Sequence, residues 1–154
     1  MTLKPANYEY LRREGTSIDE IGPVYAEIEL CNYGDLVVER VRPGTEIRTL
    51  KKRALVNSDA VELFINEEIK ELLGLRVREK RTVRLPDESL REVELVGPVE
   101  VRYENQITII LAMVLSDIEE VLLGRLPRAG LGVFIDPESR HLLVIPSRPI
   151  KRVA

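Results

Sequence analysis

Alternation of apolar and polar residues with a period of two runs through most of this chain and favours a mainly β fold. The segment Val24–Leu30 shows it most clearly, because every second residue is apolar and two glutamates lie between. Successive side chains of a strand point to opposite faces of a sheet, so this pattern predicts a half-buried strand. The same reasoning, with turn-forming residues between the segments, predicts strands at Glu46–Val56, Arg78–Leu85, Arg91–Val96, Val99–Tyr103, Ile107–Leu115, Gly132–Asp136 and His141–Ile145.

Helix signals are few, and one segment holds most of them. Asn66 is a good N-cap residue, two glutamates follow it, and Gly74 suits a left-handed C-cap. We therefore predict one short α-helix between these two residues. A second helical turn around Arg125–Ala129 is compatible with the sequence, and Ser116–Leu123 reads equally well as a loop that enters a strand.

Length and composition favour one domain without a cofactor. The 154 residues fit a single domain, 1–154, in which 1–22 is an N-terminal extension. The single cysteine, Cys31, cannot form an internal disulfide, and the single histidine, His141, excludes a histidine-cluster metal site. No phosphate-binding loop, zinc spacing or dinucleotide fingerprint is present, so we expect no cofactor and no metal.

Charge and hydropathy bear on partners and location. The 23 basic and 26 acidic side chains give a net charge of -3, which argues against a nucleic-acid binder that works by bulk charge. The longest apolar run, Ile107–Leu115, is far shorter than the roughly 20 residues that a bilayer requires. The first residues contain no apolar stretch like a signal-peptide core, so we expect a cytoplasmic protein with no membrane partner.

Two short segments carry the functional argument. The first, Ala54–Ala60, is an apolar strand that runs into the polar triplet Asn57, Ser58 and Asp59. The second, Val121–Arg125, lies about 65 residues downstream and has apolar residues before a glycine. This arrangement resembles the retropepsin-like aspartic proteases, the family of the single-domain retroviral proteases and their cellular relatives.

The resemblance spans roughly Val24–Ile145 and implies a closed, acid-protease-like β-barrel. In that family an apolar strand ends in the catalytic triplet Asp-Thr/Ser-Gly, usually followed by Ala. Here Ser58 and Ala60 match, whereas Asn57 stands where the family has its catalytic aspartate and Asp59 where it has glycine. A family segment of the type apolar-apolar-Gly packs across the active-site loop, and this role is implied for Leu122, Leu123 and Gly124.

The resemblance also implies a homodimer, because each subunit of a single-domain member supplies one catalytic aspartate. The apolar segment His141–Ile145 is a candidate for the pairing. Since the amide of Asn57 cannot ionise near neutral pH, we expect a degenerate, catalytically inactive member with a peptide-binding or structural dimer role. Two alternatives stay open, namely an active peptidase that uses Asp59 in an unusual dyad, and an unrelated small β-barrel interaction module. Asn57 and Asp59 also fit ordinary turn or capping positions.

Two further regions are candidates for binding. The stretch Thr82–Val101 has the length of the family's flap hairpin, and its expected tip, Leu85, Pro86 and Asp87, would contact substrate together with Ala60. An ordinary exposed hairpin explains this stretch equally well. The acidic loop with Asp117, Glu119 and Glu120 is a weak candidate for a divalent cation, because the ligand spacing of a calcium loop is missing.

Overall fold

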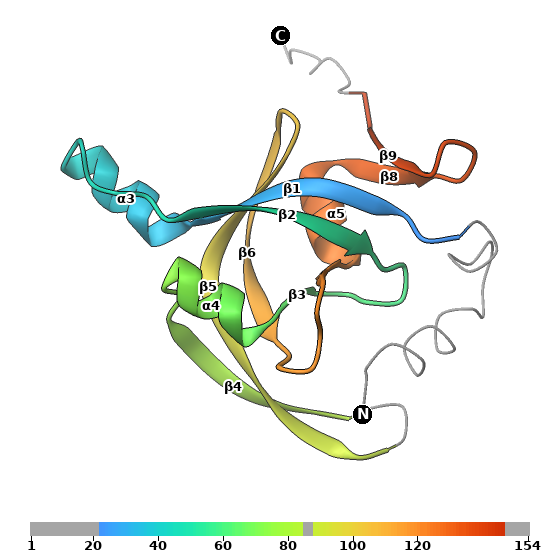
Figure 1. Ribbon diagram of the computed structural model, residues 1–154, viewed down its shortest axis with the longest axis horizontal. Coiled ribbons are helices and arrows are strands. Elements are labelled where there is room, and N and C mark those ends of the chain that lie inside the picture. The colour runs from blue at the N-terminus through green and yellow to red at the C-terminus, as the bar shows by residue number, and fades with distance from the viewer. Residues whose placement is uncertain (1–21, 85–87, 147–154) are drawn as a thin grey trace, which may run out of the picture.

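The computed structural model describes residues 22–84 and 88–146, and within them the chain forms nine strands and three helices (Figure 1). The large sheet contains β1 (Tyr25–Asn32), β2 (Thr49–Val56), β3 (Leu63–Ile65), β4 (Val77–Arg84), β5 (Leu90–Tyr103), β6 (Gln106–Val114) and β7 (Val121–Leu123). A separate hairpin contains β8 (Val133–Asp136) and β9 (His141–Val144). The helices are α3 (Tyr33–Val41), α4 (Glu67–Leu73) and α5 (Arg125–Leu131).

The large sheet closes on itself. Its strand order is β1-β2-β7-β3-β6-β5-β4, and β1 also pairs with β5, so six strands form a closed barrel and β4 extends β5 as a hairpin. The prediction of a mainly β, closed barrel is confirmed. The predicted helix is α4, the helical turn left open around Arg125–Ala129 is present as α5, and α3 is a further helix that the sequence did not indicate. None of the helices in the described residues has the length and apolarity needed to span a bilayer.

Apolar side chains fill both faces of the sheet, as the period-two pattern requires. Ala54 and Val56 belong to the main core inside the barrel, whereas Leu55 between them belongs to a second cluster on the opposite face. We call this second group the outer cluster. Its buried members are Leu55, Val93, Leu95, Met113, Leu115 and Leu122, and Tyr25, Phe64, Val83, Leu111 and Ile118 pack against them.

Strand β5 is one continuous strand, which corrects the prediction of two strands separated by a turn at Gly97. The register of β5 with β6 shifts between Val96 and Val99, the signature of a β-bulge. The shift changes the face to which odd-numbered residues point, since Leu95 lies in the outer cluster and Val99 in the main core. The bulge therefore lets a single strand contribute to the barrel wall and to the β4–β5 hairpin.

The hairpin predicted at Thr82–Val101 has different bounds in the structure. Strands β4 and β5 pair from Val77 opposite Val96 to Arg84 opposite Leu90. Strand β5 pairs with β6 from Glu94 onward, and from Val99 it pairs with β1 on its other side. The predicted tip residues Leu85, Pro86 and Asp87 lie outside the described residues.

Capping and burial together explain why the sequence predicts helix α4 but does not indicate α3. In α4, the Asn66 side chain accepts a hydrogen bond from the Ile69 amide, and Gly74 adopts the left-handed conformation at the C-terminus, as predicted. In α3, the Asn32 side chain caps the amide of Asp35, but the helix has no fully buried residue. Without a buried apolar face, the usual helical period is absent from the sequence.

Candidate active site

The loop after β2 begins at Asn57, whose side chain is buried with 1% exposure. Strand β2 runs parallel to β7, with Val56 opposite Leu123, and the Asn57 amide continues this pairing by donating to the Leu123 carbonyl at 3.2 Å. Strand β7 also pairs antiparallel with β3, so it lies between the strands on either side of the loop. Asn57 is therefore fixed against the segment Leu122, Leu123 and Gly124, which we call the crossing segment.

The side chain of Asn57 organises the turn that follows it. Its Oδ1 atom accepts hydrogen bonds from the backbone amides of Asp59 at 2.9 Å and Ala60 at 3.3 Å. The Ala60 amide also lies 3.3 Å from the Asn57 carbonyl oxygen. This is an Asx-type turn, in which a side-chain oxygen replaces a backbone acceptor. The Nδ2 group donates to none of the described residues.

Gly124 holds the crossing segment against this loop. Its amide donates to the Glu62 carbonyl at 3.1 Å, and the next amide, of Arg125, donates to the Ala60 carbonyl at 2.9 Å. A Cβ atom on Gly124 would lie 2.3 Å from the Glu62 oxygen, so only glycine allows the two backbones to approach this closely. Of the three residues implied to support the loop, Leu123 and Gly124 contact it through the backbone, while the side chain of Leu122 lies in the outer cluster.

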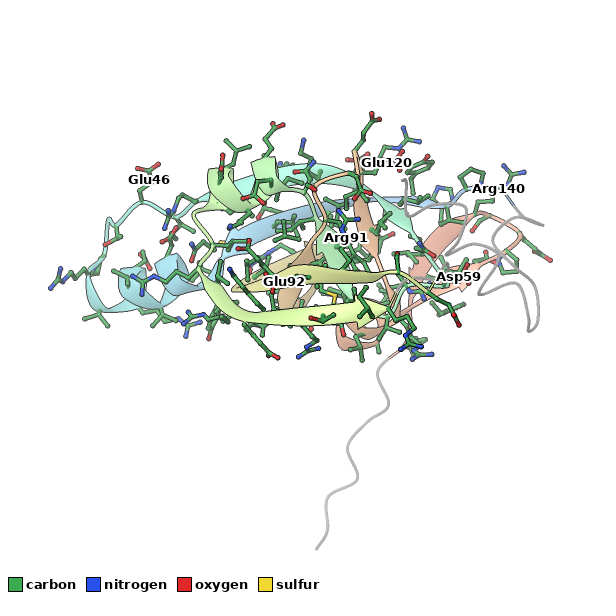
Figure 2. All side chains as sticks on the ribbon, turned by 90° about the horizontal axis from the view of Figure 1, so that it is seen from below. Glu46, Asp59, Arg91, Glu92, Glu120 and Arg140 are labelled. Atoms are coloured by element: carbon green, nitrogen blue, oxygen red, sulfur yellow. The ribbon has the colours of Figure 1, made fainter. Side chains whose placement is uncertain are left out.

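The remaining triplet residues lie beside Asn57. Ser58 and Asp59 are half-buried, and Ala60 is 5% exposed. Figure 2 shows Asp59 towards the same end of the molecule as Arg140 in the β8–β9 turn, whereas Glu46 lies at the opposite end. The structure thus brings together the triplet, Ala60 and the crossing segment.

The outer cluster lies between the β4–β5 hairpin and the strands that lead to the loop. Val83 and Leu95 of the hairpin belong to the same apolar group as Leu55 of β2 and Leu122 of β7. Leu55 is 2% exposed and Leu122 is 6% exposed. The hairpin and the strands β2 and β7 therefore contribute to one apolar cluster.

Sequence reasoning missed Arg128, which also contacts the crossing segment. Its Nε donates to the Gly124 carbonyl at 3.2 Å, within α5. Burial lowers the pKa of this guanidinium, with a smaller contribution from the neighbouring charge of Arg125. Both the amide and the carbonyl of Gly124 are thus engaged. An arginine one turn into a helix carries no sequence signal for such a contact.

The other candidate residues take ordinary structural positions. The described residues contain no cluster of side chains suited to a metal ion, and Asp117 of the acidic loop forms an ion pair with Arg91 at 3.1 Å. His141 is exposed. Cys31 is buried as predicted, and burial, followed by the charge of Glu100, raises the pKa of its thiol to about 11. A thiol in this state is a poor nucleophile.

Comparison with known proteins adds evidence on the fold. No protein-family model and no curated protein sequence matches this chain. The structure is similar to the crystal structure of the retroviral protease-like domain of Ddi1 from Leishmania major, with a TM-score of 0.52 and 15% sequence identity. The match covers 79% of this chain and 87% of that chain. The chain has a retropepsin-like fold. The predicted retropepsin-like barrel is thereby confirmed.

Proposed function

We propose that this chain is a retropepsin-like domain without aspartic-peptidase activity, which acts as a structural module by pairing with a second copy of itself. The observation that carries the proposal is the environment of Asn57. It lies at the end of β2, hydrogen-bonded to the Leu123 carbonyl and buried, and its Oδ1 atom stabilises the turn. This side chain is an amide where the resemblance implies a carboxylic acid.

The chemistry of an aspartic peptidase explains the expected loss of activity. Two carboxylates share one proton, and their repulsion separates the pKa values of the pair, so that one accepts a proton from water while the other donates to the substrate carbonyl. An amide cannot accept that proton near neutral pH. In a symmetric dimer, both subunits lose the general base at once.

Packing under the β4–β5 hairpin favours a structural role over peptide binding. In a retropepsin-like peptide groove, the ligand would lie between the hairpin and the active-site loop. Here Val93 and Leu95 of the hairpin are buried in the same cluster as Leu55. A peptide would have to displace these contacts, and re-exposing one such side chain costs roughly 1.5–3 kcal/mol.

The β8–β9 hairpin supports pairing with a second copy. On its outer face Phe134 is 46% exposed, Leu143 is 40% exposed and Ile145 is 52% exposed, and the first two are direct cross-strand neighbours. The hairpin and the triplet lie towards the same end of the molecule (Figures 1 and 2). A contiguous exposed apolar face of this kind is typical of an interaction surface.

A cleavage assay with four proteins tests the proposal. Wild type, Asn57→Asp, Asn57→Asp with Asp59→Gly, and Asp59→Asn are incubated with a peptide library between about pH 3 and pH 7, with and without pepstatin. We expect no cleavage by wild type. Pepstatin-sensitive cleavage by the double variant, which regains the family triplet, would show that a peptide can still enter beneath the hairpin. Cleavage by wild type that is lost in Asp59→Asn would instead establish the dyad that uses Asp59.

A further inference from the structure

A cavity of about 300 Å³ lies far from the candidate active site. Its wall includes Arg48, which immediately precedes β2, whereas Asn57 immediately follows that strand. Nine residues of extended chain span about 30 Å, so the cavity and the triplet lie near opposite ends of β2. In Figure 2, Glu46 and Asp59 mark these two ends of the molecule. The cavity is therefore separate from the site described above.

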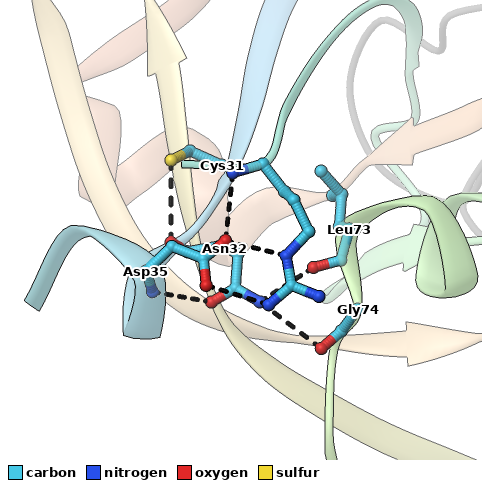
Figure 3. Close-up of polar contacts among 6 residues, drawn as sticks. Cys31, Asn32, Asp35, Leu73 and Gly74 are labelled. Carbon is cyan, nitrogen blue, oxygen red and sulfur yellow. Dashed lines mark hydrogen bonds and ion pairs between the residues drawn. The ribbon is translucent and has the colours of Figure 1, made fainter. Parts of the chain in front are cut away.

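Asn32 lines the cavity, and Figure 3 shows the polar contacts that fix this side chain. Its Oδ1 accepts from the amide of Asp35 at 3.1 Å, and its Nδ2 donates to the Leu73 carbonyl at 2.8 Å and lies 3.4 Å from the Gly74 carbonyl. One 8% exposed side chain thus joins the N-terminus of α3 to the C-terminus of α4. These hydrogen bonds hold this wall of the cavity in place without a ligand.

The guanidinium of Arg48 is neutralised within this wall. Its Nε lies 2.8 Å from Oδ2 of Asp35 and its Nη2 lies 2.9 Å from Oδ1, and the Arg48 amide also donates to the same carboxylate at 3.0 Å. A Cβ atom on Gly74 would lie 1.7 Å from the guanidinium, so this glycine leaves the space that Arg48 occupies. Arg48 and Asp35 together contribute no net charge.

Two further arginines, Arg76 and Arg78, line the cavity and provide N–H donors. The Nε of Arg78 donates to the Gly97 carbonyl at 2.8 Å, which fixes the side chain and leaves its terminal nitrogen atoms available. The register of β4 with β5 shifts around Arg78, and such bulges re-aim side chains. Neither Arg76 nor Arg78 forms an ion pair with a carboxylate in the described part of the chain.

We propose that this cavity binds a phosphate dianion, either free or as the ester group of a small molecule. Three guanidiniums against one carboxylate leave the cavity lining with two positive charges, although the whole chain carries -3. Two charges match a phosphate dianion better than a carboxylate, and the planar guanidinium fork suits bidentate contact with phosphate oxygens. A volume of about 300 Å³ is at the lower end of small-molecule sites, which excludes a large ligand.

Titration of the isotopically labelled full chain, followed by NMR, tests this proposal. Sodium phosphate, glycerol 3-phosphate and sodium acetate are added separately at constant ionic strength. We expect saturable shifts of the amide signals of Gly34, Gly74 and Gly97 with both phosphates, at a dissociation constant of about 1 mM or tighter. Tighter binding of glycerol 3-phosphate identifies an ester as the source, and equal binding identifies inorganic phosphate. Acetate should produce no saturable change.

Variants distinguish phosphate binding in the cavity from general electrostatic attraction to the protein surface. Arg76→Ala and Arg78→Lys should each weaken phosphate binding about tenfold, because each removes charge-assisted hydrogen bonds. Lys80→Ala removes one positive charge from the same strand but outside the cavity lining, and it should change affinity less than about twofold. Circular dichroism confirms that each variant is folded. Absence of saturable shifts, or an equal loss in Lys80→Ala, would overturn the proposal.

Discussion

Asn57, which stands where the resemblance implies a carboxylic acid, builds the turn that contains it. Its Oδ1 accepts two backbone hydrogen bonds, so Asn57→Ala would leave the amides of Asp59 and Ala60 without this acceptor. We expect Asn57→Ala to lower the free energy of unfolding by about 1–2 kcal/mol, as for loss of a helix N-cap. Urea denaturation measures this value. Val61→Ala, at an exposed position of the same loop, should cost less than about 0.5 kcal/mol.

Gly124 provides a sharper test of how tightly the loop and the crossing segment pack. A Cβ atom there would collide with the Glu62 carbonyl oxygen, which belongs to the backbone and cannot rotate away. We expect Gly124→Ala to lower the free energy of unfolding by more than about 3 kcal/mol or to prevent folding. The control is Gly44→Ala, where φ is positive but no atom lies within 4 Å, and where about 1 kcal/mol is expected. Similar losses in both variants would contradict the observed packing.

At the scale of the elements, helix α3 shows where sequence patterns stop being informative. Its exposed residues Val37, Val38 and Val41 are β-branched, which favours strands, and no fully buried face marks a helical period. Two contacts fix the helix. Asn32 caps its N-terminus, and Asp35 forms an ion pair with Arg48, which lies 13 residues further along the chain. By contrast, α4 carries both caps within its own sequence and was predicted.

The same distinction applies to the site. The loop and its crossing segment were predictable from short motifs, because the close approach needs glycine at position 124. The continuity of β5 was not predictable, because Gly97 and Pro98 together usually mark a turn. Only the pairing of β5 with β4, β1 and β6 shows that these two residues lie in a bulge within one strand. Arg128 was missed for a related reason, as burial of an arginine depends on tertiary packing.

The ion pair that fixes α3 predicts how stability depends on pH. Hydrogen bonds from Arg48 hold the pKa of Asp35 below its usual value. A lowered pKa in the folded state means that the ion pair stabilises the protein above the ordinary pKa of about 3.9, and that this contribution is lost as the pH falls through the lower folded-state value. Asp35→Asn should therefore be less stable than wild type by about 1 kcal/mol at pH 6. Urea denaturation should show this difference disappear at about pH 2, and a constant difference would contradict the ion-pair account.

At the scale of the whole molecule, the β8–β9 hairpin predicts self-association. We expect wild type to be dimeric. A glutamate in place of Leu143 would bury a charge in the proposed apolar interface, so Leu143→Glu should be monomeric. Light scattering coupled to size-exclusion chromatography measures the mass of each. The matched control is Val41→Glu on α3, at the opposite end of the molecule (Figure 1), which should remain dimeric. If both variants stay dimeric, another surface makes the contact.

A crystal structure of the assembled protein would test most directly whether the side chain at position 57 occupies a shared, symmetric centre. The account predicts a two-fold dimer in which the loop that holds Asn57 and the same loop of the partner lie on either side of the axis, with the two Asn57 side chains less than about 10 Å apart. A monomer, or a dimer whose two Asn57 side chains lie more than about 10 Å apart, would contradict it.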